Sequence, residues 1–377
     1  MKIPASAIIF VLLFFLYQGC SLLSPEAEDI SDLDGEIIKI LKEEKIPSLT
    51  ACIIKRDSIV WQKGYGYADF ENRIEADNET LYELASVSKL IVVTAIMQLK
   101  EQGSIDLHAD INDFLPFQTR NPHCPEYKIT IHHLLTHTSG LAWPTDEDNV
   151  PGFYQYYPMD SAPPLSEWLP EYLLPDGKHY VPTVWKKAIP GEREQYSNIG
   201  AALLGYLVEV VSGMDFNTYC KQNIFEPLEM PNTSYSYSDL DMKRVAKLYS
   251  DNYSSIGYYR QLHFPAHSLK SSIDDFSHFI MAYMNGGLYN NSRLLEENTI
   301  QEILTIRNPA SGTCLMWDLD LGNWYGHSGG EPGVSTRTEF QRDDKIGLLI
   351  FSNKWNKWVF PGKRIHACIR READKHR

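Results

Sequence analysis

Ser86 and Lys89 form an S-x-x-K motif that occurs once in the sequence. Residues three apart lie on one face of a helix, so the lysine amine can reach the serine oxygen. An uncharged amine in that position can accept the serine proton, as acyl transfer by a serine requires, and burial would keep the amine partly neutral. Such a motif is expected about once by chance at ordinary composition. Its meaning therefore depends on what the rest of the chain supplies.

The residues around this pair predict the element that would hold it. Apolar side chains recur at helical spacing after Ser86, at Leu90 and Val93 among others, and Gly103 follows as a helix stop. We therefore predict a largely buried helix over 86–102 with the serine in its first turn. The positive end of the helix dipole would favour a negative charge that develops near the serine.

Acyl transfer also needs a group that returns the proton to the leaving group, and a tyrosine is a candidate for it. Tyr196 begins a Y-x-N string over 196–198, but the same string begins at Tyr283 and at Tyr289. Placement separates the three. Tyr196 follows a Pro-Gly turn and precedes an apolar helical segment, which would place it in a turn facing a cleft. Tyr283 falls inside an amphipathic helical pattern and Tyr289 follows a Gly-Gly turn, so both are interpreted as structural.

A glycine-rich segment, His327-Ser328-Gly329-Gly330, precedes the last hairpin pattern of the chain. A strand there would form an edge beside which a substrate could lie, because glycines permit close backbone approach. The backbone N–H of Gly330 could join that of Ser86 as the pair of donors that stabilises an oxyanion. The sequence thus supplies a candidate for each component of a serine acyl-transfer site.

These motifs, in their order along the chain, resemble the blocks of the β-lactamase-related serine hydrolases. The resemblance spans residues 50–355 and rests on four segments: Phe70–Lys89 with its Ser-Val-Ser-Lys, Thr130–Leu141, Pro190-Gly191 before Tyr196-Ser197-Asn198, and Gly326–Gly329. That family includes class C β-lactamases, DD-peptidases, D-amino-acid amidases and esterases of the same fold. The resemblance implies a serine hydrolase that forms an acyl-enzyme.

The resemblance also implies roles for single residues. Ser86 would be the nucleophile and Lys89 its proton acceptor. Tyr196 would help to deprotonate the serine and would protonate the leaving group, while Asn198 would bind a substrate amide. Class C β-lactamases carry Lys-Thr-Gly where this chain has His327-Ser328-Gly329, which favours an esterase, a D-Ala-D-Ala peptidase or a D-amino-acid peptidase over a true β-lactamase. A non-catalytic envelope protein that binds peptidoglycan is a further alternative, although it would need neither the lysine nor the tyrosine.

The remaining patterns predict an α+β fold of the β-lactamase/transpeptidase-like type. Two strand patterns, Leu49–Ile54 and Ser58–Tyr65, flank a polar turn, and a second hairpin pattern covers Val334–Phe340 and Ile346–Ser352. Residues 105–310 favour an inserted, mainly helical lobe. Because strand patterns come from both ends of the chain, we expect them to meet in one antiparallel sheet flanked by helices.

Two other chemistries match short strings of the sequence. Residues 326–330 fit G-x-S-x-G, the nucleophile elbow of α/β-hydrolases, which would make Ser328 the nucleophile. An elbow must run from a strand into a helix, whereas a hairpin pattern follows here. His133 and His137 stand four apart as in zinc peptidases, but Leu134 replaces the expected glutamate. We expect these histidines to cap a helix or to form buried hydrogen bonds, and we expect neither a metal nor a cofactor.

The N-terminal residues have the character of an export signal. A charged start, an apolar run and Gly19-Cys20 match a signal peptide over 1–20, and the end of that segment resembles a bacterial lipobox. The resemblance implies a lipid on Cys20. We expect a polar tether over 21–35 and a β-lactamase-related catalytic domain over 36–377. The domain would then be membrane-anchored in the cell envelope, on its periplasmic or extracellular face.

Composition limits the partners. The net charge is −14 and no long basic cluster offers a path for a phosphate backbone, which excludes nucleic acid. We expect a small ester, amide or peptide as substrate, and membrane attachment only through the lipid. If Cys20 is lipidated, five cysteines remain, an odd number that cannot all pair within one chain. Cys52 lies in a strand-like apolar run and is predicted to be a core residue.

Overall fold

The computed structural model of the protein describes residues 32–142, 156–357, 359–360 and 363–377. The predicted signal peptide, Cys20 and most of the predicted tether lie outside these segments. The fold and the site below are built from the described residues.

The first described element, α1 (Asp32–Glu43), corrects the end of the predicted tether. Residues 32–35 are helical, because Leu33 and Ile37 are buried in a cluster that also contains side chains of the sheet. A tether would leave these apolar groups in water. Their spacing of four residues was the sequence signal for this helix.

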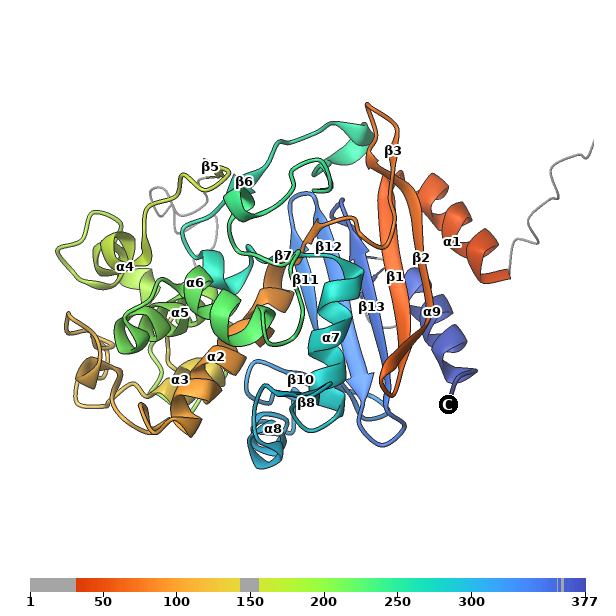
Figure 1. Cartoon of the computed structure of the whole chain (residues 1–377). Helices are drawn as coiled ribbons and strands as arrows, with labels where there is room; N and C mark the ends of the chain where they lie inside the picture. Colours follow the sequence, from red (N-terminus) through yellow and green to blue (C-terminus); the bar gives the residue numbers. More distant parts are fainter. Residues whose placement is uncertain (1–31, 143–155, 358, 361–362) are drawn as a thin grey trace, which may run out of the picture.

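An antiparallel sheet of seven strands, in the order β10-β11-β12-β13-β1-β2-β3, forms the frame of the molecule (Figure 1). Strand β1 pairs along its length with β13, so the sheet joins the two ends of the chain as predicted. The two predicted hairpins are β1–β2 and β12–β13. The strands of this sheet are β1 (Ser48–Lys55), β2 (Ser58–Asp69), β3 (Ile74–Glu75), β10 (Asp318–Asp320), β11 (Trp324–Glu331), β12 (Val334–Gln341) and β13 (Ile346–Ser352).

Helices cover both faces of the sheet. Helices α1 and α9 lie together on one face, whereas α7 lies on the other face and the remaining helices form a lobe beyond it (Figure 1). The predicted helical lobe is thus present. The helices after α1 are α2 (Lys89–Glu101), α3 (Ile131–Leu135), α4 (Leu165–Leu173), α5 (Asn198–Ser212), α6 (Phe216–Cys220), α7 (Ile273–Met284), α8 (Glu297–Ile303) and α9 (Arg364–Asp374).

Three two-stranded ladders join loops of the lobe. The first, β4–β7, brings the chain to the start of α2 and connects the lobe to the sheet. The other two ladders are peripheral. The strands are β4 (Tyr82–Glu83), β5 (Tyr157–Pro158), β6 (Tyr259–Arg260), β7 (Lys270–Ser271), β8 (Leu288–Tyr289) and β9 (Ser292–Arg293).

The centre of the lobe is α5, whose residues are buried from its first turn to Val208. Among the described residues no single helix has the length and apolar character to cross a membrane. Helix α5 and the segment Phe216–Phe225 pass such a test only as a pair, bent by 79°. Burial explains the apolar character of α5, because the core helix of a large domain meets no water.

Candidate active site

Ser86 lies in a short 3₁₀ helix, η1 (Ala85–Ser88), which runs directly into α2. The predicted helix is therefore confirmed, with a tighter first turn. Ser86 is 8% exposed and Lys89 is fully buried. Ala85, immediately before the serine, has φ of +47°, a left-handed conformation that costs a non-glycine residue about 1–2 kcal/mol. The turn that presents Ser86 is strained, so its neighbours must hold it in place.

Hydrogen bonds from two directions hold this turn. Thr336 on β12 donates its hydroxyl to the carbonyl of Leu84 at 2.7 Å, and the N–H of Leu84 donates to the carbonyl of Leu269 at 2.8 Å. The Ser88 hydroxyl donates to the Ala85 carbonyl at 2.6 Å and accepts the N–H of Leu269 at 3.1 Å. The sheet and the segment leading to β7 thus fix the backbone on either side of the serine.

Lys89 is placed to act as a base toward Ser86. Its Nζ lies 3.0 Å from Ser86 Oγ and 2.9 Å from the carbonyl oxygen of Ala266. Burial lowers the pKa of Lys89 to about 7, although the negative charges of Glu331 and Asp318 oppose this shift. A neutral amine can donate one N–H to the carbonyl while its lone pair faces the serine hydroxyl. The Ala266 carbonyl therefore orients the base.

Tyr196 lies beside Ser86 and Lys89, in the segment before α5 where a turn was predicted. Lys89 Nζ is 4.8 Å from the centroid of its ring, and the rings of His137 and His327 are 4.6 and 6.3 Å away. The surrounding protein desolvates the hydroxyl and raises the pKa of Tyr196 well above its ordinary value, against a hydrogen bond to Ser86 that lowers it. The phenol stays protonated at neutral pH. Of the two groups, only Lys89 can accept a proton there.

Asn198 is the first residue of α5, directly after the N-cap residue Ser197. Its side chain is 2% exposed, and its Oδ1 accepts no hydrogen bond from any described residue. A buried acceptor without a donor is costly, by about 1–3 kcal/mol. Asn198 therefore offers an acceptor for an N–H group of a bound molecule.

Half of β11 is an open edge. Strand β10 pairs with Trp324–Gly326 only, and from His327 onward β11 pairs solely with β12 within the described part of the chain. A Cβ atom on Gly329 would lie 2.3 Å from the carbonyl oxygen of Leu84. Only glycine lets the strand come this close to the turn that carries Ser86. The predicted edge strand is thus present, although β10 covers its first part.

His327 and Ser328 point to opposite faces of the sheet, as neighbours in a strand must. His327 is buried, and desolvation together with the charge of Lys89 lowers its pKa to about 3. Its Nδ1 lies 2.7 Å from the Ser328 carbonyl. A carbonyl can only accept, so Nδ1 carries the proton and Nε2 is left as an acceptor. The ring is therefore neutral.

Ser328 was predicted to belong to the site, but its hydroxyl does not join Ser86. It accepts a hydrogen bond of 3.2 Å from Arg337, whose guanidinium also pairs with Glu339. Glu339 in turn binds His366 and Arg370 of α9, so this network occupies the face covered by that helix. Only the backbone of Ser328 borders the open edge.

The alternative chemistries are not supported. Strand β11 continues through Ser328 and returns as β12 rather than entering a helix, so no nucleophile elbow exists here. His133 caps α3 together with Thr130, and His137, beyond the end of that helix, accepts the N–H of Ser197 at 3.2 Å. Both predicted structural roles are confirmed. The described residues contain no group of three or more His, Cys, Asp or Glu side chains placed to hold a metal.

All five cysteines within the described segments are free and buried. Cys52 is fully buried in the main core, as predicted, and burial raises the pKa of its thiol far above the ordinary value. These side chains act as small apolar groups.

Two acids of the site were missed by the sequence analysis. Glu331 ends β11, and burial with the nearby charge of Glu83 raises its pKa to about 7. Asp318 begins β10, and burial raises its pKa to about 6. Nothing in the local sequence distinguishes them from other acidic residues, because only the folding of β10 and β11 brings them within electrostatic reach of Lys89.

The sheet, the flanking helices and the serine–lysine pair at the start of α2 define a β-lactamase/transpeptidase-like protein. The chain belongs to the Beta-lactamase family, whose model matches residues 33–366. Members of this family are in general serine hydrolases.

Individual relatives agree with this assignment. The chain is 26% identical to the putative penicillin-binding protein PbpX of Bacillus subtilis (strain 168), over 86% of this chain and 75% of that one. It is 27% identical to protein flp of Staphylococcus aureus (strain MRSA252) over 67% of this chain and 48% of flp. The chain thus spans about half the length of the curated Staphylococcus relatives it matches.

Solved structures show the same fold. The penicillin-binding protein from Bacillus halodurans is 26% identical, with a TM-score of 0.69 over 89% of this chain and 98% of that one. The class C β-lactamase from Rhodobacter sphaeroides also has a TM-score of 0.69, over 91% of this chain and 98% of that chain, at 18% identity. The predicted fold class is confirmed.

Proposed function

We propose that this protein is a serine hydrolase that forms an acyl-enzyme on Ser86 and cleaves esters or amides. The contact of the buried Lys89 amine with Ser86 Oγ, at 3.0 Å, is the observation that carries the proposal. A lysine with a pKa of about 7 is neutral often enough at physiological pH to act as a base. A protein that only bound its ligand would gain nothing from burying a lysine at this cost.

The reaction would proceed in two halves. Ser86 Oγ attacks the carbonyl carbon while its proton passes to Lys89 Nζ, and the N–H groups of Ser86 and Gly330 stabilise the oxyanion. The tetrahedral intermediate then breaks its bond to the leaving group, which receives a proton through Tyr196. In the second half water attacks the acyl-enzyme by the same route, which releases the acid and restores the serine.

Labelling with a fluorophosphonate tests this proposal. We expect one covalent adduct on Ser86, because the probe requires an activated hydroxyl beside oxyanion donors. The intact mass counts the adducts, and peptide mapping locates them. Ser86→Ala should abolish labelling, whereas Ser328→Ala, which removes a hydroxyl on the opposite face of the sheet, should leave it unchanged.

A label on Ser328 would contradict the assignment of the nucleophile. No label, under conditions in which a control hydrolase reacts, would instead favour the non-catalytic envelope protein that binds peptidoglycan.

His327 bears on the choice between esters and β-lactams. Its neutral ring offers no fixed positive charge to a substrate carboxylate, and Arg337, the neighbouring cation, is bound to Glu339 on the other face. We expect uncharged esters or amides to be better substrates than β-lactams or peptides with a free carboxylate. His327→Lys should shift the ratio of kcat/KM toward the carboxylate by about tenfold, the size of one charge-assisted hydrogen bond.

The measurement compares kcat/KM for a carboxylate substrate and for its methyl ester in both proteins. It runs between about pH 5 and pH 9, a range that brackets the pKa of an ordinary histidine. Because the pKa of His327 is about 3, its charge should not change the wild-type preference across this range. A wild type that favours the free carboxylate would show that another group recognises it and would refute the role of His327.

A further inference from the structure

Glu331 occupies the far end of the open edge of β11. It lies two and four residues beyond Gly329 and His327, and alternate residues of a strand face the same side. Its side chain therefore belongs to the face on which Ser86 lies, and it is only partly buried. Its carboxylate accepts a long hydrogen bond, 3.5 Å, from Gln261 Nε2. The carboxylate is thus only weakly engaged.

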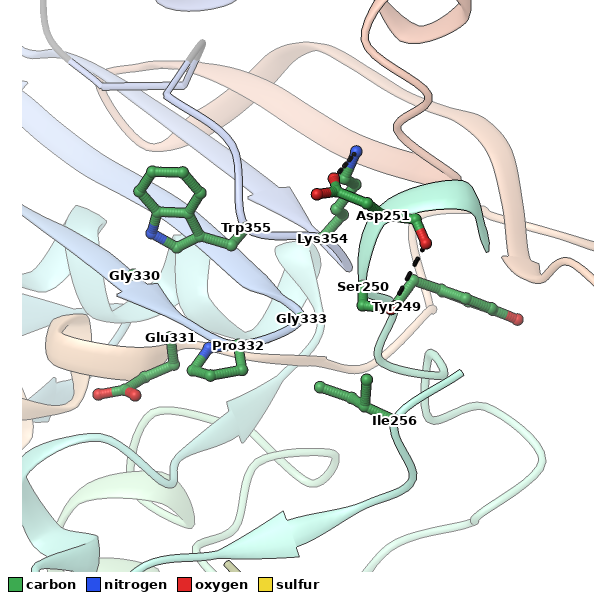
Figure 2. Close-up of a pocket in the computed structure, with 10 residues that line it drawn as sticks. All are labelled: Tyr249, Ser250, Asp251, Ile256, Gly330, Glu331, Pro332, Gly333, Lys354 and Trp355. Atoms are coloured by element: carbon green, nitrogen blue, oxygen red, sulfur yellow. Dashed lines mark hydrogen bonds and ion pairs between the residues drawn. The ribbon is translucent and has the colours of Figure 1, made fainter. Parts of the chain in front are cut away.

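A cavity of about 470 Å³ begins beside this residue. Its walls include Pro332, Ile256 and Trp355, so much of the lining is apolar, and Trp355 is 56% exposed. Figure 2 shows the Glu331 carboxylate pointing away from the ion pair between Asp251 and Lys354 on the other side of this cavity. Glu331 therefore stands between the cavity and the turn that carries Ser86.

The neighbouring cations do not neutralise this carboxylate. Lys354 pairs with Asp251 at 3.0 Å and donates to the Glu44 carbonyl. Lys270 donates to the Tyr235 carbonyl at 3.1 Å. Lys89 interacts electrostatically with Glu331, but with a pKa of about 7 the lysine is only partly charged at neutral pH. A substrate bound along the open edge therefore meets a carboxylate that forms no ion pair with a described lysine or arginine.

We infer that Glu331 is a specificity-determining residue that selects substrates bearing an ammonium group close to the scissile carbonyl. The chemical class is an ester or amide of an amino acid with a free amine. Ionic pairing in a partly buried cleft would hold such a group, and the buried Asn198 Oδ1, which lacks a donor, is a second acceptor for its N–H. This inference rests on the proposed function of Ser86.

The test compares alanine methyl ester, in both enantiomers, with methyl propionate, which lacks only the amine. At about pH 7.5 most α-amino groups are still protonated. We expect the wild type to favour one alanine ester over methyl propionate by about tenfold in kcat/KM, the size of one charge-assisted hydrogen bond. Glu331→Gln should remove this preference, measured as the ratio of kcat/KM for the two esters, because any change in the pKa of Lys89 affects both esters alike. Turnover of methyl propionate shows that the variant is folded.

Asp251→Asn is the matched control, because it removes one negative charge from the same cavity at a carboxylate already paired with Lys354. It should keep the preference. If the probe labels Ser86 but the unlabelled wild type shows no preference for the alanine ester, the inference is overturned and the proposed function stands. A preference that survives in Glu331→Gln has the same meaning. Failure of labelling at Ser86 would overturn both.

Discussion

Lys89→Met is expected to lower kcat/KM for any ester hydrolysed through Ser86 by about 10³- to 10⁴-fold, the upper range for a general base. The amine is the group beside Ser86 that can accept its proton, since Tyr196 remains protonated. Methionine keeps the length and apolar character of the stem, so the core should repack with little loss. Steady-state rates with a chromogenic ester give the ratio.

Lys270→Met is the matched control for this experiment. Lys270 is also fully buried, and burial lowers its pKa to about 8, but its amine donates to the Tyr235 carbonyl rather than to the serine. Its replacement should change kcat/KM by far less than that of Lys89. Comparable losses in the two variants would mean that Lys89 is only a structural residue.

The pH dependence separates these roles further. The base must be neutral to act, so kcat/KM of the wild type should rise as pH increases through about 7, the pKa of Lys89. Between this value and an unfolded pKa of about 10.4, the unfolded chain binds more protons than the folded protein. The wild type should therefore gain stability with rising pH in that window. Lys89→Met should lose this contribution to the slope, which thermal unfolding at several pH values measures.

Tyr196→Phe is expected to lower kcat/KM by about 10²- to 10³-fold, less than the loss of the base, because water can replace part of a proton relay. The rise in activity through about pH 7 should persist in this variant, since it belongs to Lys89. Tyr283→Phe is the matched control. Tyr283 begins another Y-x-N string, and its hydroxyl is buried and hydrogen-bonded to Thr94. A control variant as slow as Tyr196→Phe would contradict the assignment.

Much of this site could be predicted because its components are local in the sequence. The serine and lysine are three residues apart, and the helical spacing after them placed both at one helix start. Glycine at 329 was predicted from the need for close approach, and the Cβ clash with Leu84 gives the geometric reason. The central sheet could be predicted equally well, since the strand patterns at both ends of the chain are long and apolar.

What sequence reasoning missed depends on side-chain direction and on distant contacts. Ser328 was grouped with its neighbours, although the alternation of a strand turns its hydroxyl toward Arg337 and α9. The carbonyl of Ala266 carries no sequence signal, because every residue has one. A role for the Glu331 carboxylate could be inferred only once the position of β11 relative to Ser86 was known.

The pairing of β1 with β13 has a consequence for how this chain reaches its native state. Leu49 lies opposite Ser352 in the middle of the sheet, so the central ladder closes only after nearly the whole polypeptide is available. Such distant contacts slow folding, because loop-closure entropy must be overcome before the ladder stabilises the protein. A chain that stops before β13 would leave an apolar edge of β1 uncovered, which is a template for aggregation. Premature termination after β2 but before residue 346 should therefore yield insoluble material rather than a shortened enzyme.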